Sequence, residues 1–140
     1  MHPDLEKAKE VLKKEKLTCV LTLGNVMFKS KDKGVQPLLD WMNSGNNYMS
    51  YMIADKVIGR AAAFIDIAMG IREVYAEVMS ESAKTLLENN HVVVNADTIV
   101  PEILNKDKTD LCPLEKAVEG IENAADALMP IELALIRMNS

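Results

Sequence analysis

Helix-like and strand-like stretches alternate along this sequence, and that order constrains the fold more than any other feature. Residues 3–16 carry apolar side chains at helical spacing. Residues 17–23 and 26–28 are strand-like and flank Gly24 and Asn25, the pattern of a β-hairpin. Because helices and strands continue to alternate after this point, we expect one α/β domain with helices on both sides of a sheet.

The most apolar helix of this expected domain lies in the middle of the sequence. We expect it to begin at Asp55, to end at Gly70 and to be buried against the sheet, because it is apolar around most of its circumference. Alternation with a period of two over residues 73–79 predicts a strand nearer the edge of the sheet. Ser80 is then a favourable N-cap for a helix over residues 81–90.

Several shorter segments lie between these elements. Residues 37–42 predict a short helix, and residues 48–53 predict either a short strand or an extended lead-in. Residues 92–94 predict a short buried strand. Residues 97–105 are expected to hold a helical turn around Pro101.

The last part of the sequence is expected to be helical. One helix begins at Cys112 and reaches about residue 121, and another covers residues 123–137, where Pro130 should kink or split it. We treat residues 1–140 as a single domain with an apolar helical tail over residues 123–140.

Composition excludes several classes of protein. Apolar residues make up 49% and charged residues 26% of 140 residues, which is typical of a folded protein. With 16 Lys plus Arg against 21 Asp plus Glu, the net charge of −5 argues against a nucleic-acid partner. Two cysteines form no disulfide framework, and no signal segment opens the chain, so we expect a cytoplasmic protein. The apolar stretches are too short to cross a membrane.

Common catalytic motifs are missing from the sequence. It contains no phosphate-binding loop of the glycine-lysine type, no dinucleotide glycine fingerprint and no G-x-S-x-G elbow. His2 and His91 are its two histidines, too few for a multi-histidine zinc site and poorly placed for a serine-histidine triad. We therefore expect no metal and no cofactor.

Cys112 is the first candidate for chemistry. A thiol at the N-cap of a helix feels the positive end of the helix dipole, which favours the thiolate. The alternative is that Cys112 is a small apolar residue beside a turn, as we expect for Cys19 within an apolar strand. Glu115, three residues after Cys112, fits a capping box in which its carboxylate returns to the Cys112 amide.

Asp55 and Lys56 are the second candidate. At the mouth of a buried helix, a carboxylate and an ammonium group would orient a ligand or tune a nucleophile. The alternative is that Asp55 only caps the helix. Arg60 follows Lys56 by four residues, so both cations would face either an anionic ligand or solvent.

Four separated motifs resemble a small prokaryotic family of unknown function with a cytidine-deaminase-like fold. They are residues 55–63, residues 73–78, Val100 with Pro101, and residues 112–117, within a resemblance that covers residues 4–122. The resemblance implies a three-layer α/β/α domain with a mixed sheet. Zinc deaminases require an H-x-E and a P-C-x-x-C motif, and this sequence has neither, so the deaminase reaction is not expected.

Two functions remain open, and whether the protein is an enzyme is left undecided. In the first, Asp55, Lys56, Ser80, Ser82 and Cys112 form a pocket for a small anionic or nucleoside-like molecule, to which Glu115 also contributes. Asp55 and Cys112 would then be catalytic, with the thiol as nucleophile or redox group. In the second, the apolar tail makes the protein a non-catalytic homo-oligomeric module. A metal site formed by Asp55 and Cys112 is weaker, because two ligands are too few.

Overall fold

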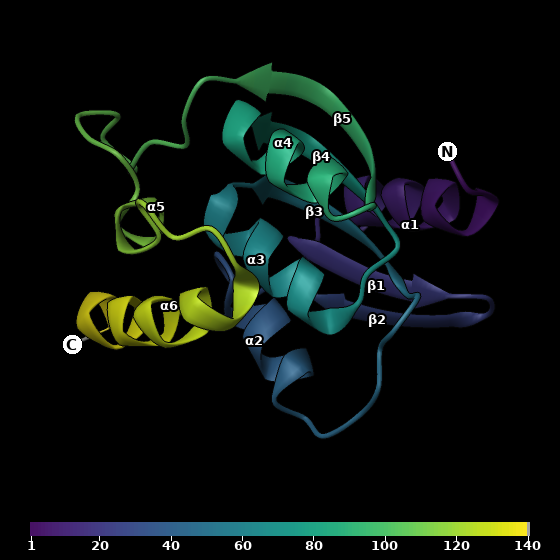
Figure 1. Ribbon diagram of the computed structural model, residues 1–140. Coiled ribbons are helices and arrows are strands. Elements are labelled where there is room, and N and C mark those ends of the chain that lie inside the picture. Colours follow the sequence, from purple (N-terminus) through teal and green to yellow (C-terminus); the bar gives the residue numbers. More distant parts are fainter. Residues whose placement is uncertain (140) are drawn as a thin grey trace.

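A five-stranded mixed sheet forms the centre of the protein in the computed structural model, which describes residues 1–139 (Figure 1). The strand order is β2-β1-β3-β4-β5. β1 is antiparallel to both β2 and β3, whereas β3, β4 and β5 are parallel. The strands are β1 Cys19–Leu23, β2 Val26–Ser30, β3 Met52–Ile58, β4 Glu73–Ser80 and β5 Val93–Val100.

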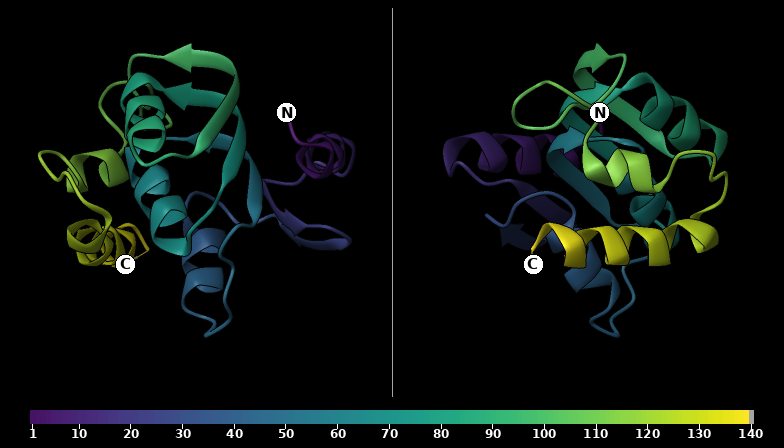
Figure 2. Two further views of the ribbon diagram at one scale, coloured as in Figure 1. Left: turned by 45° about the vertical axis from the view of Figure 1, so that its right-hand side comes forward. Right: turned by 90° about the vertical axis from the view of Figure 1, so that its left-hand side faces the viewer.

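Helices cover both faces of the sheet, as the alternation of elements predicted. α1 lies alone on one face, and the other helices lie on the opposite side (Figure 2). α6 forms an outer layer, in contact with α3 and α5. The helices are α1 Pro3–Lys14, α2 Gln36–Met42, α3 Arg60–Met69, α4 Glu81–Asn89, α5 Pro113–Ala117 and α6 Ala124–Met138. None of them is long and apolar enough to cross a bilayer.

Three predictions that depend on local signals are confirmed. β1 and β2 form the expected hairpin, with Gly24 in the left-handed region at a φ of 57°. The Ser80 hydroxyl accepts a hydrogen bond of 3.1 Å from the Ala83 amide and so caps α4. Gly70 ends α3 at a φ of 76°.

The prediction that a helix begins at Asp55 is wrong. Asp55 and Lys56 belong to β3, and α3 begins five residues later with Gly59 as its N-cap. The reason is long-range pairing, because β3 hydrogen-bonds to β1 on one side and to β4 on the other. Lys56 and Arg60 therefore do not share a helical face. The undecided stretch 48–53 contributes only its last two residues to this strand.

The last two strands also differ from the prediction. β4 lies one strand from the edge of the sheet, but its second face is not less buried, because α1 covers Tyr75 on the face that alternation marked as less buried. β5 is the edge strand, longer and more exposed than the buried strand predicted for residues 92–94. It continues to Val100, so no helical turn surrounds Pro101.

A long segment over residues 101–121, here called the strap, connects β5 to the last helix (Figure 1). Within the strap, α5 begins after Cys112 as predicted but ends at Ala117, before the expected residue 121. α6 follows the strap and continues through Pro130 as one helix, so the predicted split does not occur. The strap crosses the carboxyl ends of the parallel strands, where it encloses the site described next.

Candidate functional site

A pocket of about 310 Å³ lies beyond the carboxyl ends of β3, β4 and β5 and is here called the strand-end pocket. Polar side chains from the first turns of α3 and α4 line one side, and the strap forms the other. In open α/β sheets this edge is where ligands usually bind. The lining residues are Arg60, Ser80, Ser82, Pro101, Glu102, Ile103, Leu111, Glu115, Glu119 and Gly120.

The carboxylate of Glu115 is bound to the first turn of α3. Its Oε1 accepts a hydrogen bond of 2.7 Å from the Arg60 amide, and its Oε2 accepts one of 2.9 Å from the Ala61 amide. Glu115 is only 9% exposed. The predicted capping box is therefore wrong: Glu115 caps a helix 55 residues away along the sequence, and the Cys112 amide donates to the Ile103 carbonyl instead.

Gly59 allows this close approach. Gly59 is the N-cap of α3 and has no side chain that could accept hydrogen bonds from the free amides of the first turn. The Glu115 carboxylate accepts these hydrogen bonds instead. A Cβ atom at residue 59 would lie 2.4 Å from Oε1 of Glu115 and 2.6 Å from its Cδ. The φ of Gly59 is −96°, which any residue adopts, so the contact with Glu115, and not backbone conformation, requires glycine here.

Among residues 1–139, Arg60 supplies the one cation in the lining. Its guanidinium donates to the Ser82 hydroxyl at 3.1 Å and to the Ile121 carbonyl, and it lies 5.0 Å from the centre of the Phe64 ring. These contacts connect α3, α4 and the end of the strap. Arg60 therefore holds the wall of the pocket together as well as lining it.

The charge of the pocket is mainly negative. Glu102, Glu115 and Glu119 contribute three carboxylates against the single guanidinium of Arg60. The side chains of Glu102 and Glu119 are exposed and make no hydrogen bond or ion pair with any residue in the range 1–139. Both are therefore available to accept hydrogen bonds from a ligand.

Three of the predicted site residues line the pocket, and three do not. Ser80, Ser82 and Glu115 are part of the lining, whereas Cys112, Asp55 and Lys56 are not. Cys112 is half-buried at the N-cap of α5 and packs against the core. Lys56 is exposed on β3, and Asp55 is buried between β3 and α3. No hydrogen bond joins Cys112 to Asp55 among the described residues.

Asp55 belongs instead to a buried acidic cluster with Cys19 and Asp66. Asp55 lies opposite Cys19 in the ladder between β1 and β3. Burial raises the pKa of Asp55 to about 7, although the amides of Lys56 and Val57 and the Cys19 thiol moderate that rise. Burial, and then the nearby carboxylate of Asp55, raise the pKa of Asp66 well above its ordinary value.

Asp66 has no partner in this cluster. It is completely buried on α3, and neither carboxylate oxygen has a hydrogen-bond partner within residues 1–139. Asp66 is not among the site residues predicted from the sequence, although a single carboxylate inside an otherwise apolar helix is a visible signal. Within the same residues, no group of three or more His, Cys, Asp and Glu side chains is arranged to hold a metal ion.

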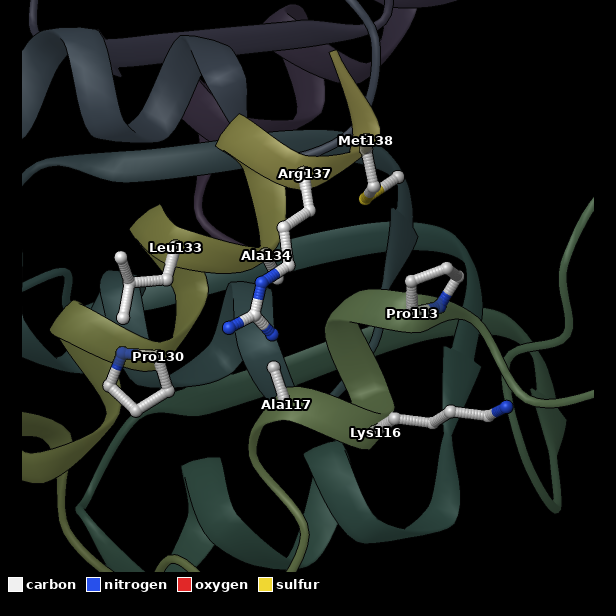
Figure 3. A pocket seen from close by; sticks show the side chains of 8 residues that line it. All are labelled: Pro113, Lys116, Ala117, Pro130, Leu133, Ala134, Arg137 and Met138. Atoms are coloured by element: carbon white, nitrogen blue, oxygen red, sulfur yellow. The ribbon is translucent and has the colours of Figure 1, made fainter. Parts of the chain in front are cut away.

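A second cavity, of about 550 Å³, lies on the outer surface between α5 and α6. Figure 3 shows apolar side chains on its floor, the Arg137 guanidinium extending from α6 toward α5, and Lys116 extending away from the floor. The neighbouring surface of α6 exposes four large apolar side chains: Met129, Leu133, Ile136 and Met138. This apolar surface differs in kind from the polar strand-end pocket and is suited to a protein contact.

Comparisons with known proteins support the fold. A family model described as TM1506, a domain of unknown function (DUF1893), matches residues 7–133. The chain is similar to the crystal structure of a DUF1893 family protein (TM1506) from Thermotoga maritima, with a TM-score of 0.85 and 25% sequence identity. That match covers 98% of this chain and 91% of the other. No curated protein matches the sequence.

Proposed function

Because this chain belongs to the TM1506 family of domains of unknown function (DUF1893), we propose its function from its own residues. We propose that it binds a small nucleoside-like molecule in the strand-end pocket. That the fold is of the cytidine-deaminase-like type is part of the proposal. It is supported by the mixed five-stranded sheet with helices on both faces.

The position of the pocket is the observation that carries this proposal. It lies at the carboxyl ends of three parallel strands, beside two helix starts. Its volume of about 310 Å³ is at the lower end of the roughly 300–1,000 Å³ of typical small-molecule sites. Apolar Ile103 and Leu111 offer contact to a flat ring, and the serines and glutamates offer hydrogen bonds to polar edges.

The proposal includes binding but assigns no reaction. The ligand set of a zinc deaminase is missing from the sequence, and catalysis by Cys112 with Asp55 stays a prediction, since neither residue lines the pocket. We propose the cytoplasm as the place of action, supported by two free cysteines.

A blocking substitution tests the binding proposal. Ser82→Trp places a large ring at the pocket wall, whereas Thr85→Trp places the same ring on an exposed part of α4 that does not line the pocket. In calorimetric titrations with adenosine, cytidine, guanosine and uridine, we expect at least one to bind the unmodified protein. We expect Ser82→Trp to weaken that binding by at least about tenfold, or 1.4 kcal/mol, and Thr85→Trp to leave it unchanged. Equal binding by both variants would exclude this pocket.

A second function, homo-oligomerisation through α6, is favoured by the apolar surface of that helix. Met129 and Ile136 are 67% and 64% exposed, and Leu133 and Met138 on the same helix are exposed as well. Burying them against a second copy would remove this surface from water.

A charged substitution tests this second function. We expect Ile136→Glu to convert an oligomer to a monomer in light scattering, because burying an unpaired carboxylate in the contact is costly. Val93→Glu, at an exposed position on β5, is the matched control and should leave the mass unchanged. A monomeric unmodified protein would rule out assembly through α6.

A further inference from the structure

We infer that Glu115 makes the strand-end pocket select against anions, so that its ligand is an uncharged or positively charged molecule with N–H or O–H donors. This inference rests on the proposed binding function and narrows its ligand class. It departs from the anionic alternative that the sequence suggested.

The amides at the start of α3 are already occupied. Free amides in the first turn of a helix normally attract a phosphate or carboxylate group from a ligand. Here the two oxygens of Glu115 accept from Arg60 and Ala61 at 2.7 and 2.9 Å. A ligand anion therefore meets a carboxylate where it would otherwise meet hydrogen-bond donors.

Glu115 is fixed in that position. Its side chain is more than nine-tenths buried, and Gly59 lies against the carboxyl group closely enough that no Cβ atom would fit between them. The strap that carries Glu115 is also bound to α3 at its far end, where Arg60 donates to the Ile121 carbonyl. Moving Glu115 aside for a ligand anion would therefore disturb the packing of the strap.

The other charges around the pocket also disfavour a ligand anion. Glu102 and Glu119 add two exposed carboxylates without a protein partner among residues 1–139. The guanidinium of Arg60 is already engaged by Ser82, Ile121 and the ring of Phe64. Like charges repel a ligand anion, whereas carboxylates accept hydrogen bonds from amino and hydroxyl groups.

Removal of the Glu115 carboxylate tests the inference with inorganic phosphate as the probe. We expect phosphate to produce saturable amide shifts at Arg60 and Ala61 in Glu115→Ala and no saturable shift at these amides in the unmodified protein. Glu122→Ala, which removes the same charge from an exposed position outside the pocket, should behave like the unmodified protein. Because the probe is phosphate alone, this result does not depend on whether any nucleoside binds.

The outcomes separate the inference from the proposed function. Saturable binding of phosphate at Arg60 and Ala61 in the unmodified protein would overturn the inference, as would its absence in Glu115→Ala. If Glu115→Ala does not fold, Glu115→Ser, which also withdraws the carboxylate from these two amides, must show phosphate binding there. In the unmodified protein, a nucleoside that binds should do so at least about tenfold more tightly than its 5′-monophosphate. Equal affinity would also overturn the inference, whereas failure of every nucleoside to bind would refute only the proposed function.

Discussion

Gly59→Ala is expected to destabilise the protein by about 3 kcal/mol, which combines the cost of overpacking with the loss of a helix cap. The added Cβ atom would lie 2.4 Å from the Glu115 carboxylate, a separation that real contacts do not reach. Either the carboxylate leaves the amides of Arg60 and Ala61, or α5 moves away from α3. Urea unfolding measured at one pH checks the expected change in the free energy of unfolding.

The double variant provides the control for this prediction. Glu115→Ala alone should lower the free energy of unfolding by about 2 kcal/mol, which is the typical contribution of hydrogen bonds to a charged group. In that background the space beside Gly59 is open, so the same Gly59→Ala change should cost less than about 1 kcal/mol. The coupling between the two sites is then about 2 kcal/mol, within the range for residues in contact. Additive effects would show that Glu115 does not lie against Gly59 in solution.

Asp66→Asn is expected to stabilise the protein increasingly as the pH rises. The pKa values of Asp55 and Asp66 are both raised in the folded state, so both groups bind a proton more tightly there than in the unfolded chain. The free energy of unfolding is therefore highest below the ordinary aspartate pKa of 3.8, where both carboxyl groups are protonated in either state. It decreases as the pH rises through the folded pKa, which is about 7 for Asp55. Each such group costs about 1.4 kcal/mol of stability per pH unit across that window.

Unfolding measured from pH 4 to pH 8 tests this prediction. Asp66→Asn should be close to the unmodified protein near pH 4 and should become more stable than it with a slope of up to about 1.4 kcal/mol per pH unit toward pH 7, because it removes one of the two titrating groups. Asp107→Asn, at an exposed position in the strap, should follow the unmodified protein at every pH. Parallel curves for Asp66→Asn and the unmodified protein would mean that Asp66 does not take up a proton on folding.

The elements that the sequence predicted correctly are those determined by neighbouring residues. The hairpin turn depends on Gly24 and Asn25, and the cap of α4 depends on Ser80 and an amide three residues later. Asp55 gave an equally clear local signal for a helix start, but hydrogen bonds to β1 and β4 hold it in a strand. Local preference of a few tenths of a kcal/mol is readily overridden by such tertiary pairing.

The strand-end pocket could be predicted only in part. Ser80 and Ser82 were expected there because topology places helix starts beside strand ends. The role of Glu115 was not accessible in the same way, because its partners are 54 and 55 residues distant and its nearest local partner was the Cys112 amide. Asp66 could have been noticed within its apolar helix, but its lack of a partner is a property of the packed structure.

Amide chemical shifts recorded during a nucleoside titration test the central claim, that the strand-end pocket is the ligand site, most directly. We expect the largest shifts at Arg60, Ser82, Glu119 and Gly120, which lie on opposite walls of the pocket. The amide signals of residues that line the cavity between α5 and α6, such as Leu133 and Met138, should not shift. Saturable shifts confined to that cavity, or the absence of saturable shifts with all four nucleosides, would contradict the claim.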